Sequence, residues 1–178
     1  MAPRGGYIAG RADLVEASGE RLTAPGISED VSSALDFNRP AFQGLFMAPL
    51  IVEQALKGAV FSAAYLAAKG YTVSPTADAH RTDIIQCIAF GEADKLRKFS
   101  QGIQAASALE SYVTPYDDQL PGYDDPVIMA GGTFIQGSSI ELSIDGPMRE
   151  PFIGYMQGGL SISHIITSVC LAAKRMEE

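Results

Sequence analysis

The sequence predicts an α+β domain in which helices cover one face of an antiparallel sheet. Apolar residues recur at spacings of three and four across residues 38–69, which is typical of a helix. In "SSIELSI" (residues 138–144), apolar and polar residues alternate, which is typical of a half-buried strand. The predicted elements follow in the order αββαβββα, with strands and helices unevenly mixed, and this favours an α+β layer.

The N-terminal residues predict a strand, a helix and a connector. "GGYIAG" (residues 5–10) is an apolar run between glycines, and a helical pattern begins near Ala12. Residues 21–40 are rich in Pro, Gly, Ser and Asp, which is typical of turns. We therefore expect a domain boundary there, with one unit over residues 1–37 and an α+β domain over residues 38–178.

The helix predicted from residue 38 has Pro40 near its first position and ends at Gly70. Pro49 is expected to kink or split it. One broad apolar face is predicted, which a sheet or another helix must cover. Its members are Leu56, Val60, Phe61, Ala64, Tyr65 and Ala68.

The middle of the chain predicts two strands, "YTVS" (residues 71–74) and "RTDIIQCIAF" (residues 81–90). A helix follows over residues 92–107, and "ESYVTP" (residues 110–115) reads as a further short strand. The helix should direct Leu96, Phe99 and Ile103 to the core. Its basic residues, Lys95, Arg97 and Lys98, are interpreted as a solvated face.

The C-terminal part predicts a β-meander and a helix. Strands are expected in "PVIMAGGTFIQ" (residues 126–136), "SSIELSI" and "PFIGYMQ" (residues 151–157), with "DGP" (residues 145–147) as the turn between the last two. The final helix starts after Ser161 and has Lys174 and Arg175 near its end. Its predicted inner face comprises Ile162, Ile165, Ile166, Val169 and Cys170.

Composition excludes several classes of function. The hydrophobic content of 47% fits a folded core, and the formal charge of −8 argues against broad nucleic-acid binding. Cys87 and Cys170 show no metal-ligand spacing, so no metal site is predicted. Neither a secretory signal nor an apolar run of about 20 residues is evident. We expect a cytoplasmic protein without a membrane partner.

Three segments carry candidate chemistry, each beside a plainer interpretation. The acidic loop over residues 116–126 lacks the spacing of a calcium loop and reads as solvated or as lining an active site. Residues 132–139 resemble a phosphate loop but lack its lysine, so a bulge or a close backbone approach is preferred. Arg149, after a turn, could bind a carboxylate or be an exposed charge beside Glu150.

The run "YDDQLPGYDDPVIMAGGTFIQGSSIELSIDGPMREPFIGYMQGGL" resembles the C-terminal signature of the aluminium-resistance family, also called methionine gamma-lyase-like proteins. "GGYIAGR", "RLTAPGI", "FQGLFMAP", "ALKGAVF" and "RTDIIQ" resemble the same family in the same order. The likeness therefore covers essentially the whole chain. This family is related to the cystathionine β/γ-lyases.

The resemblance implies a pyridoxal-phosphate-dependent carbon–sulfur lyase of fold type I, acting on a sulfur-containing amino acid and assembled as a homo-oligomer. Residues 1–37 would be the end of the large cofactor domain, and residues 38–178 the small C-terminal domain. Arg149, or as second choice Arg21, would bind the substrate carboxylate. Gly5 and Gly6 would lie near the cofactor phosphate, although Arg4 replaces the small hydroxyl residue expected beside them.

One departure from the family bears on activity. Family members are more than twice as long, and their Schiff-base lysine lies upstream of the segment that matches "APRGGYIAG". None of the lysines in this chain stands in that context, so we expect the chain alone to bind no cofactor and to be inactive. The alternative is a non-catalytic domain for partner binding or oligomerisation. Whether such an enzyme performs β- or γ-elimination stays open.

Overall fold

The computed structural model describes residues 8–22, 24–27, 37–132 and 140–178. The chain divides into two units, Met1–Pro49 and Leu50–Glu178. The first contains α1 (Ala12–Leu22), in which no residue is buried, and the start of α2 (Asn38–Ala68). The boundary expected near residue 37 remains a prediction about domain organisation.

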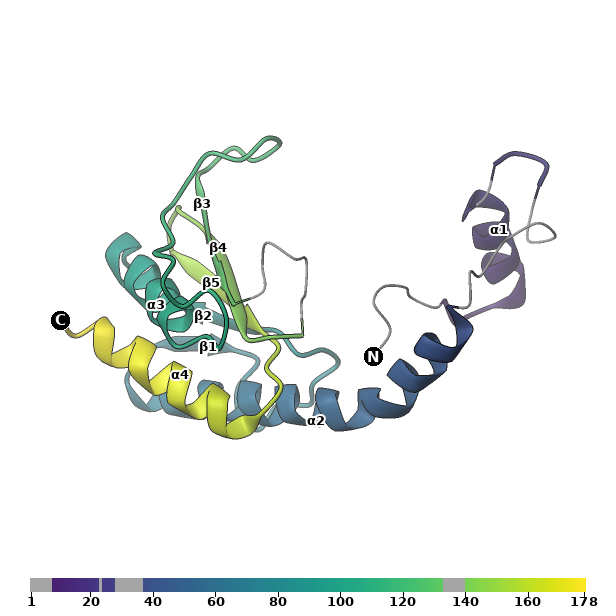
Figure 1. The fold of residues 1–178 in the computed structure, drawn as a ribbon. Helices are drawn as coiled ribbons and strands as arrows, with labels where there is room; N and C mark the ends of the chain where they lie inside the picture. Colours follow the sequence, from purple (N-terminus) through teal and green to yellow (C-terminus); the bar gives the residue numbers. More distant parts are fainter. Residues whose placement is uncertain (1–7, 23, 28–36, 133–139) are drawn as a thin grey trace. The chain divides into compact units, whose positions relative to one another are not determined.

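The second unit confirms the predicted α+β class (Figure 1). Its strands are β1 (Thr72–Ser74), β2 (Gln86–Ala89), β3 (Val127–Gly131), β4 (Ser143–Pro147) and β5 (Ile153–Gln157). They form one sheet in the order β1-β2-β5-β4-β3, and every neighbouring pair is antiparallel. Its other helices are α3 (Ala93–Ala105) and α4 (Ile162–Arg175).

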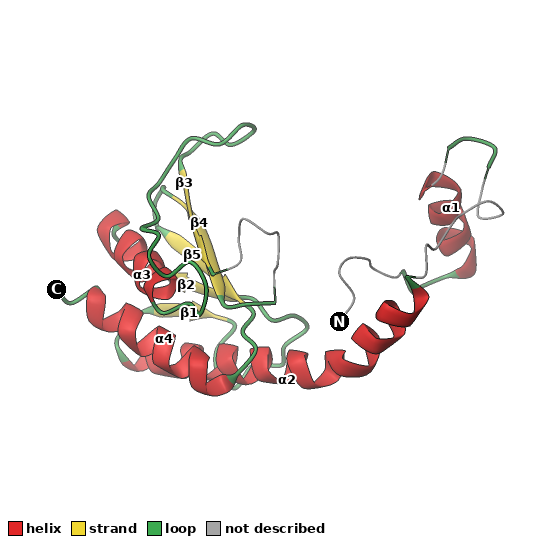
Figure 2. Cartoon of the chain, viewed as in Figure 1, coloured by secondary structure: helices red, strands yellow, loops and turns green. Residues whose placement is uncertain are grey.

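The core lies between the sheet and its helices, which Figure 2 shows in yellow and red. Alternating residues of β4 and β5, such as Ile144 and Met156, point into it. On α3, the predicted inner residues Leu96, Phe99 and Ile103 are all buried, which confirms that face. Because strand side chains alternate, the neighbours of the core residues point to the opposite face of the sheet.

The predicted buried face of α2 is only partly confirmed: Phe61 and Tyr65 pack against the core, whereas Val60, Ala64 and Ala68 are exposed. The buried residues of α2 are small apart from Leu66. Small side chains let α4 approach closely: a Cβ added at Gly58 would lie 2.4 Å from Ile165 Cδ1. The buried set is Ala55, Gly58, Ala59, Ser62, Ala63 and Leu66.

Other expectations also change. The helix α2 continues through Pro49 rather than splitting there. Residues 110–115 form a bend, a short turn and irregular chain instead of a strand, and Glu110 adopts a positive φ of 54°. "DGP" is not the turn of the meander, because residues 145–147 end β4 and the chain turns after them. Ile8 and Ala9 are not in a strand, and residues 5–7 lie outside the described residues.

By length and composition alone, α2 could cross a membrane, although the sequence had suggested no such segment. This is weak evidence, since core helices of soluble proteins pass the same test. The C-terminal half of α2 buries six residues, and Gly58 packs against α4. The part of α2 within the second unit therefore behaves as a core helix.

Candidate functional site

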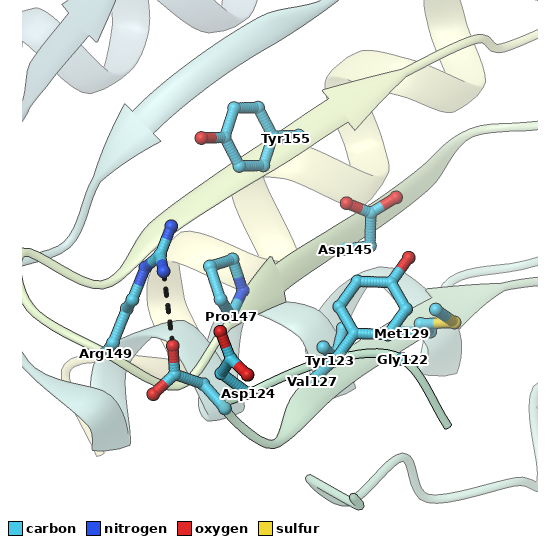
Figure 3. A pocket seen from close by; sticks show the side chains of 10 residues that line it. Gly122, Tyr123, Asp124, Val127, Met129, Asp145, Pro147, Arg149 and Tyr155 are labelled. Carbon is cyan, nitrogen blue, oxygen red and sulfur yellow. Dashed lines mark hydrogen bonds and ion pairs between the residues drawn. The ribbon is translucent and has the colours of Figure 1, made fainter. Parts of the chain in front are cut away.

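A cavity of about 400 Å³ opens on the sheet face that the helices leave uncovered. Outward-pointing residues of β3, β4 and β5 form its floor, and residues 122–125 of the acidic loop form its wall (Figure 3). The register of the strands brings three residues of the floor together, because Met129 on β3 pairs with Asp145 on β4, and Asp145 pairs with Tyr155 on β5. These three side chains therefore form a row across three strands.

The acidic loop is fixed over the sheet by contacts on either side of it. Asp118 and Val127 exchange two backbone hydrogen bonds, at 3.1 and 2.9 Å. Arg97 Nε on α3 donates to Asp117 Oδ1 at 2.7 Å, and this bond lowers the pKa of Asp117. The loop is both solvated and part of the cavity lining, because Tyr123 and Asp124 are exposed and also line the cavity. Asp124 and Asp125 line the cavity, whereas Asp117 and Asp118 do not.

Arg149 lies at the cavity, where the chain turns after β4. Its Nη1 is 3.3 Å from Asp125 Oδ2, and 66% of its side chain is exposed (Figure 3). Arg149 is thus both an exposed charge and a residue of the site. A substrate carboxylate that bound Arg149 would have to compete with Asp125.

Asp145 and Tyr155 are cavity residues that sequence reasoning missed, and Asp145 is the titratable carboxylate of the floor. It is half-buried on the cavity floor, and this desolvation raises its pKa. A signal was present, because a carboxylate at an outward position of a strand faces whatever occupies that side of the sheet. With Asp124, Asp125 and Arg149, it gives the lining three acidic groups and one basic group.

The exchange Asp145→Asn is expected to stabilise the chain at pH 7. A carboxyl whose pKa is raised by folding binds its proton more tightly in the folded chain, so folding loses stability as pH rises through the raised pKa. The gain in stability should disappear near pH 3, below the ordinary carboxyl pKa of about 4. Denaturant midpoints at about pH 7 and pH 3 measure the stability of the variant. The control is Asp124→Asn, which replaces an exposed carboxyl of the same cavity. A variant that is less stable at pH 7 would contradict the expected cost of burial.

The roles of the other predicted site residues stay predictions. Arg21 lies in the last turn of α1, in the first unit, and is exposed. Gly5 and Gly6 lie outside the described residues, as does most of the phosphate-loop-like segment. In the part of the chain that the structure describes, no group of three His, Cys, Asp or Glu residues could hold a metal ion.

None of the five lysines lines the cavity of Arg149. A Schiff-base amine must lose its proton inside a pocket, and ion pairing opposes that loss. Lys57, Lys69, Lys95 and Lys98 form ion pairs of 2.6 to 3.0 Å with carboxylates, and the pairing raises the pKa of Lys69 and Lys95. Lys174 lies in the last turn of α4, away from the cavity of Arg149.

Comparison with known proteins identifies relatives along the whole chain. The sequence model of the methionine gamma-lyase family matches residues 1–177. The uncharacterized protein YnbB of Bacillus subtilis (strain 168) is 49% identical over 172 residues, which are 97% of this chain and 41% of YnbB. An uncharacterized 33.9 kDa protein of Lactobacillus delbrueckii subsp. bulgaricus is 43% identical over 92% of this chain and 54% of its own length. The chain thus spans about two fifths to one half of these relatives.

Solved structures agree in fold. A candidate cystathionine beta-lyase involved in aluminium resistance from Listeria monocytogenes superimposes with a TM-score of 0.89 at 48% identity, over 98% of this chain and 43% of that protein. A carbon-sulfur lyase involved in aluminium resistance from Clostridium novyi NT gives 0.83 at 45% identity, over 93% and 38%.

Proposed function

The chain belongs to the methionine gamma-lyase family, and from this we propose that it is the C-terminal part of a pyridoxal-phosphate-dependent carbon–sulfur lyase. The superposition on the Listeria protein, at 48% identity and a TM-score of 0.89 over 98% of the chain, is the observation that carries the proposal. In the proposal, residues 38–178 are the small domain of a fold-type-I enzyme, and residues 1–37 are the end of its large cofactor domain. The substrate class is a sulfur-containing amino acid such as methionine or cystathionine.

The cavity beneath the acidic loop is the proposed contribution of this chain to substrate binding. Arg149 holds the substrate carboxylate, with Asp125 as the group that orients its guanidinium until substrate arrives. Tyr123, Tyr155 and Met129 offer apolar surface to the rest of an amino acid. Arg21 is the second candidate for the carboxylate, and Gly5 and Gly6 for the cofactor phosphate.

The cofactor amine comes from outside this chain in the proposal. Pyridoxal phosphate supplies an electron sink once a lysine of the enzyme holds it. The residues described here hold no lysine that fits, so no step of the reaction is assigned to this chain through the cofactor. The enzyme would work as a cytoplasmic homo-oligomer, without nucleic acid or membrane.

The chain alone is expected to form no Schiff base with pyridoxal phosphate. The test is to mix equimolar amounts, record the near-visible absorbance, reduce with borohydride and measure the mass of the protein. An unchanged absorbance and mass are expected, because the paired lysines remain protonated. One reduced adduct per chain on a single lysine would contradict the proposal, whereas low, scattered labelling of several lysines would match free surface amines.

A second candidate function is a non-catalytic domain that binds a partner or a second copy. Large apolar side chains at the start of α2 favour it: Phe42, Leu45 and Phe46 are 71%, 59% and 84% exposed. The two candidates differ in activity rather than in association. If the chain binds the part of a relative that it does not itself match, and the complex shows no lyase activity, the second candidate is preferred.

A further inference from the structure

Arg81 carries a guanidinium that is largely enclosed but poorly satisfied. It lies in the loop between β1 and β2, and its side chain reaches back to α2, where Nη2 is 3.5 Å from the carbonyl oxygen of Ala59. Nη2 also donates a shorter hydrogen bond to Gln86 Oε1. Gln86 is fully buried, and its Nε2 donates to the carbonyl oxygens of Pro75 and Cys87 at 3.0 and 3.1 Å. The loop, β2 and α2 therefore hold the Arg81 side chain in one orientation.

The other donors of Arg81 have nothing to bond to within the described chain. A guanidinium has five N–H groups, and Nη2 supplies only two of them. Both Nε and Nη1 are buried and lack an acceptor among the described residues. A buried donor without an acceptor destabilises the fold, and more so when the donor is charged.

The charge of Arg81 is also uncompensated. No carboxylate of the described residues lies within ion-pairing distance of it, and burial lowers its pKa. Asp83 acts on it only at longer range, and its Oδ1 accepts a hydrogen bond from the Ile85 N–H at 2.8 Å. Burying an unpaired charge is costly, so a fold that keeps Arg81 there indicates a counter-anion.

We infer that Arg81 is the anchor of a carboxylate-binding site. A carboxylate supplies both the negative charge and the several acceptor lone pairs that Nε and Nη1 require. The neighbouring loop residues His80, Thr82 and Asp83 are exposed, whereas Nε and Nη1 are enclosed, so a ligand reaches them from the loop side only when this loop shifts. None of these residues lines the cavity of Arg149, and the two sites are separate.

The test is stabilisation of the chain by acetate. Thermal unfolding is followed while acetate replaces chloride at constant ionic strength, for wild type, Arg81→Met and Arg97→Met. Arg97 is the matched control, since it is an arginine already paired with Asp117. The wild type and Arg97→Met should show a saturable rise in Tm on the order of 3 °C, and Arg81→Met should show none.

Two outcomes of the acetate titration overturn the inference: no saturable rise in the Tm of the wild type, or an equal rise in the Tm of Arg81→Met. In chloride alone, Arg81→Met loses an unpaired buried charge, which favours folding, and the hydrogen bond to the buried Gln86 Oε1, which opposes it, so its Tm should stay close to that of wild type. A large loss of stability there would make Arg81 a structural brace and would also overturn the inference. If the variant does not fold, the NMR signal of Arg81 Nε–H in the wild type decides, since it must shift saturably with acetate.

A second arm distinguishes two sources of carboxylate. L-methionine and its methyl ester, which lacks the carboxylate, are compared with acetate. Binding of L-methionine tighter than acetate, with loss in the ester, identifies a free amino acid. Equal binding of acetate and L-methionine means that the site recognises the carboxylate alone, as it would when it binds a side-chain carboxylate of another polypeptide segment. Both results keep the site, and neither requires catalysis, so the failure of the proposed lyase function would leave this inference standing.

Discussion

Arg149→Met is expected to raise KM for the sulfur-containing amino acid by about 10- to 100-fold, with a smaller change in kcat. A hydrogen bond to a charged group contributes about 1.5–3 kcal/mol, and each 1.4 kcal/mol is a factor of ten. A group that holds the carboxylate throughout the reaction binds ground and transition states alike, so KM changes most. The kinetics require an enzyme assembled from this chain and the part of YnbB that it does not match.

Two variants make this prediction specific. Lys69→Met removes the basic residue of another ion pair, with Glu177, away from the cavity and its acidic loop, and should leave KM unchanged. Asp125→Asn removes the carboxylate that pairs with Arg149 and should lower KM, because substrate then meets no competitor. If Arg149→Met and Lys69→Met alter KM equally, Arg149 is only a surface charge.

Phe99→Ala is expected to reduce the free energy of unfolding by about 3–5 kcal/mol. Phe99 is fully buried on α3, and its ring centroid lies 5.1 Å from that of Phe90. A domain has only about 5–15 kcal/mol of stability, so the loss is a large share. Chemical denaturation monitored by circular dichroism measures it.

Phe46→Ala is the matched control for this exchange. The same atoms are removed from a side chain that is 84% exposed, so the stability of the isolated chain should change by less than about 0.5 kcal/mol. Equal losses in both variants would mean that the core does not lie between α3 and the sheet.

The helices differ in how well sequence alone predicts them. In α3, charged residues mark the outer side, so Leu96, Phe99 and Ile103 could be assigned to the core correctly. In α2, apolar residues occur all round, so the predicted face was only partly correct: Phe61 and Tyr65 pack against the core, but Val60, Ala64 and Ala68 do not. The face of α2 that packs is the one that lets α4 come close, as Gly58 does for Ile165. Hydrophobic periodicity does not show which face allows this close approach.

The end of β4 shows why turn signals mislead. Asp-Gly-Pro is a strong turn pattern, yet here the glycine serves the packing of two strands. A Cβ at Gly146 would lie 2.5 Å from the carbonyl oxygen of Ile153 on β5. The real turn carries Arg149, so moving the turn by a few residues is what brings that arginine to the cavity.

The site itself was only partly predictable. Arg149 and the acidic loop were selected from the sequence, and the structure places both at one cavity. Asp145 and Tyr155 were missed because their proximity depends on the register between β4 and β5, which no local pattern specifies. Arg81 was missed because a lone arginine in a polar loop gives no sign that Gln86 will fix it.

Mapping the cofactor in the assembled enzyme tests the central claim most directly. This chain is combined with the part of YnbB that it does not match, loaded with pyridoxal phosphate, reduced with borohydride and digested for mass spectrometry. The account predicts one phosphopyridoxyl group per assembled active site, on a lysine of the added segment. A group on Lys57, Lys69, Lys95, Lys98 or Lys174, or bound cofactor with no reduced lysine at all, would contradict it.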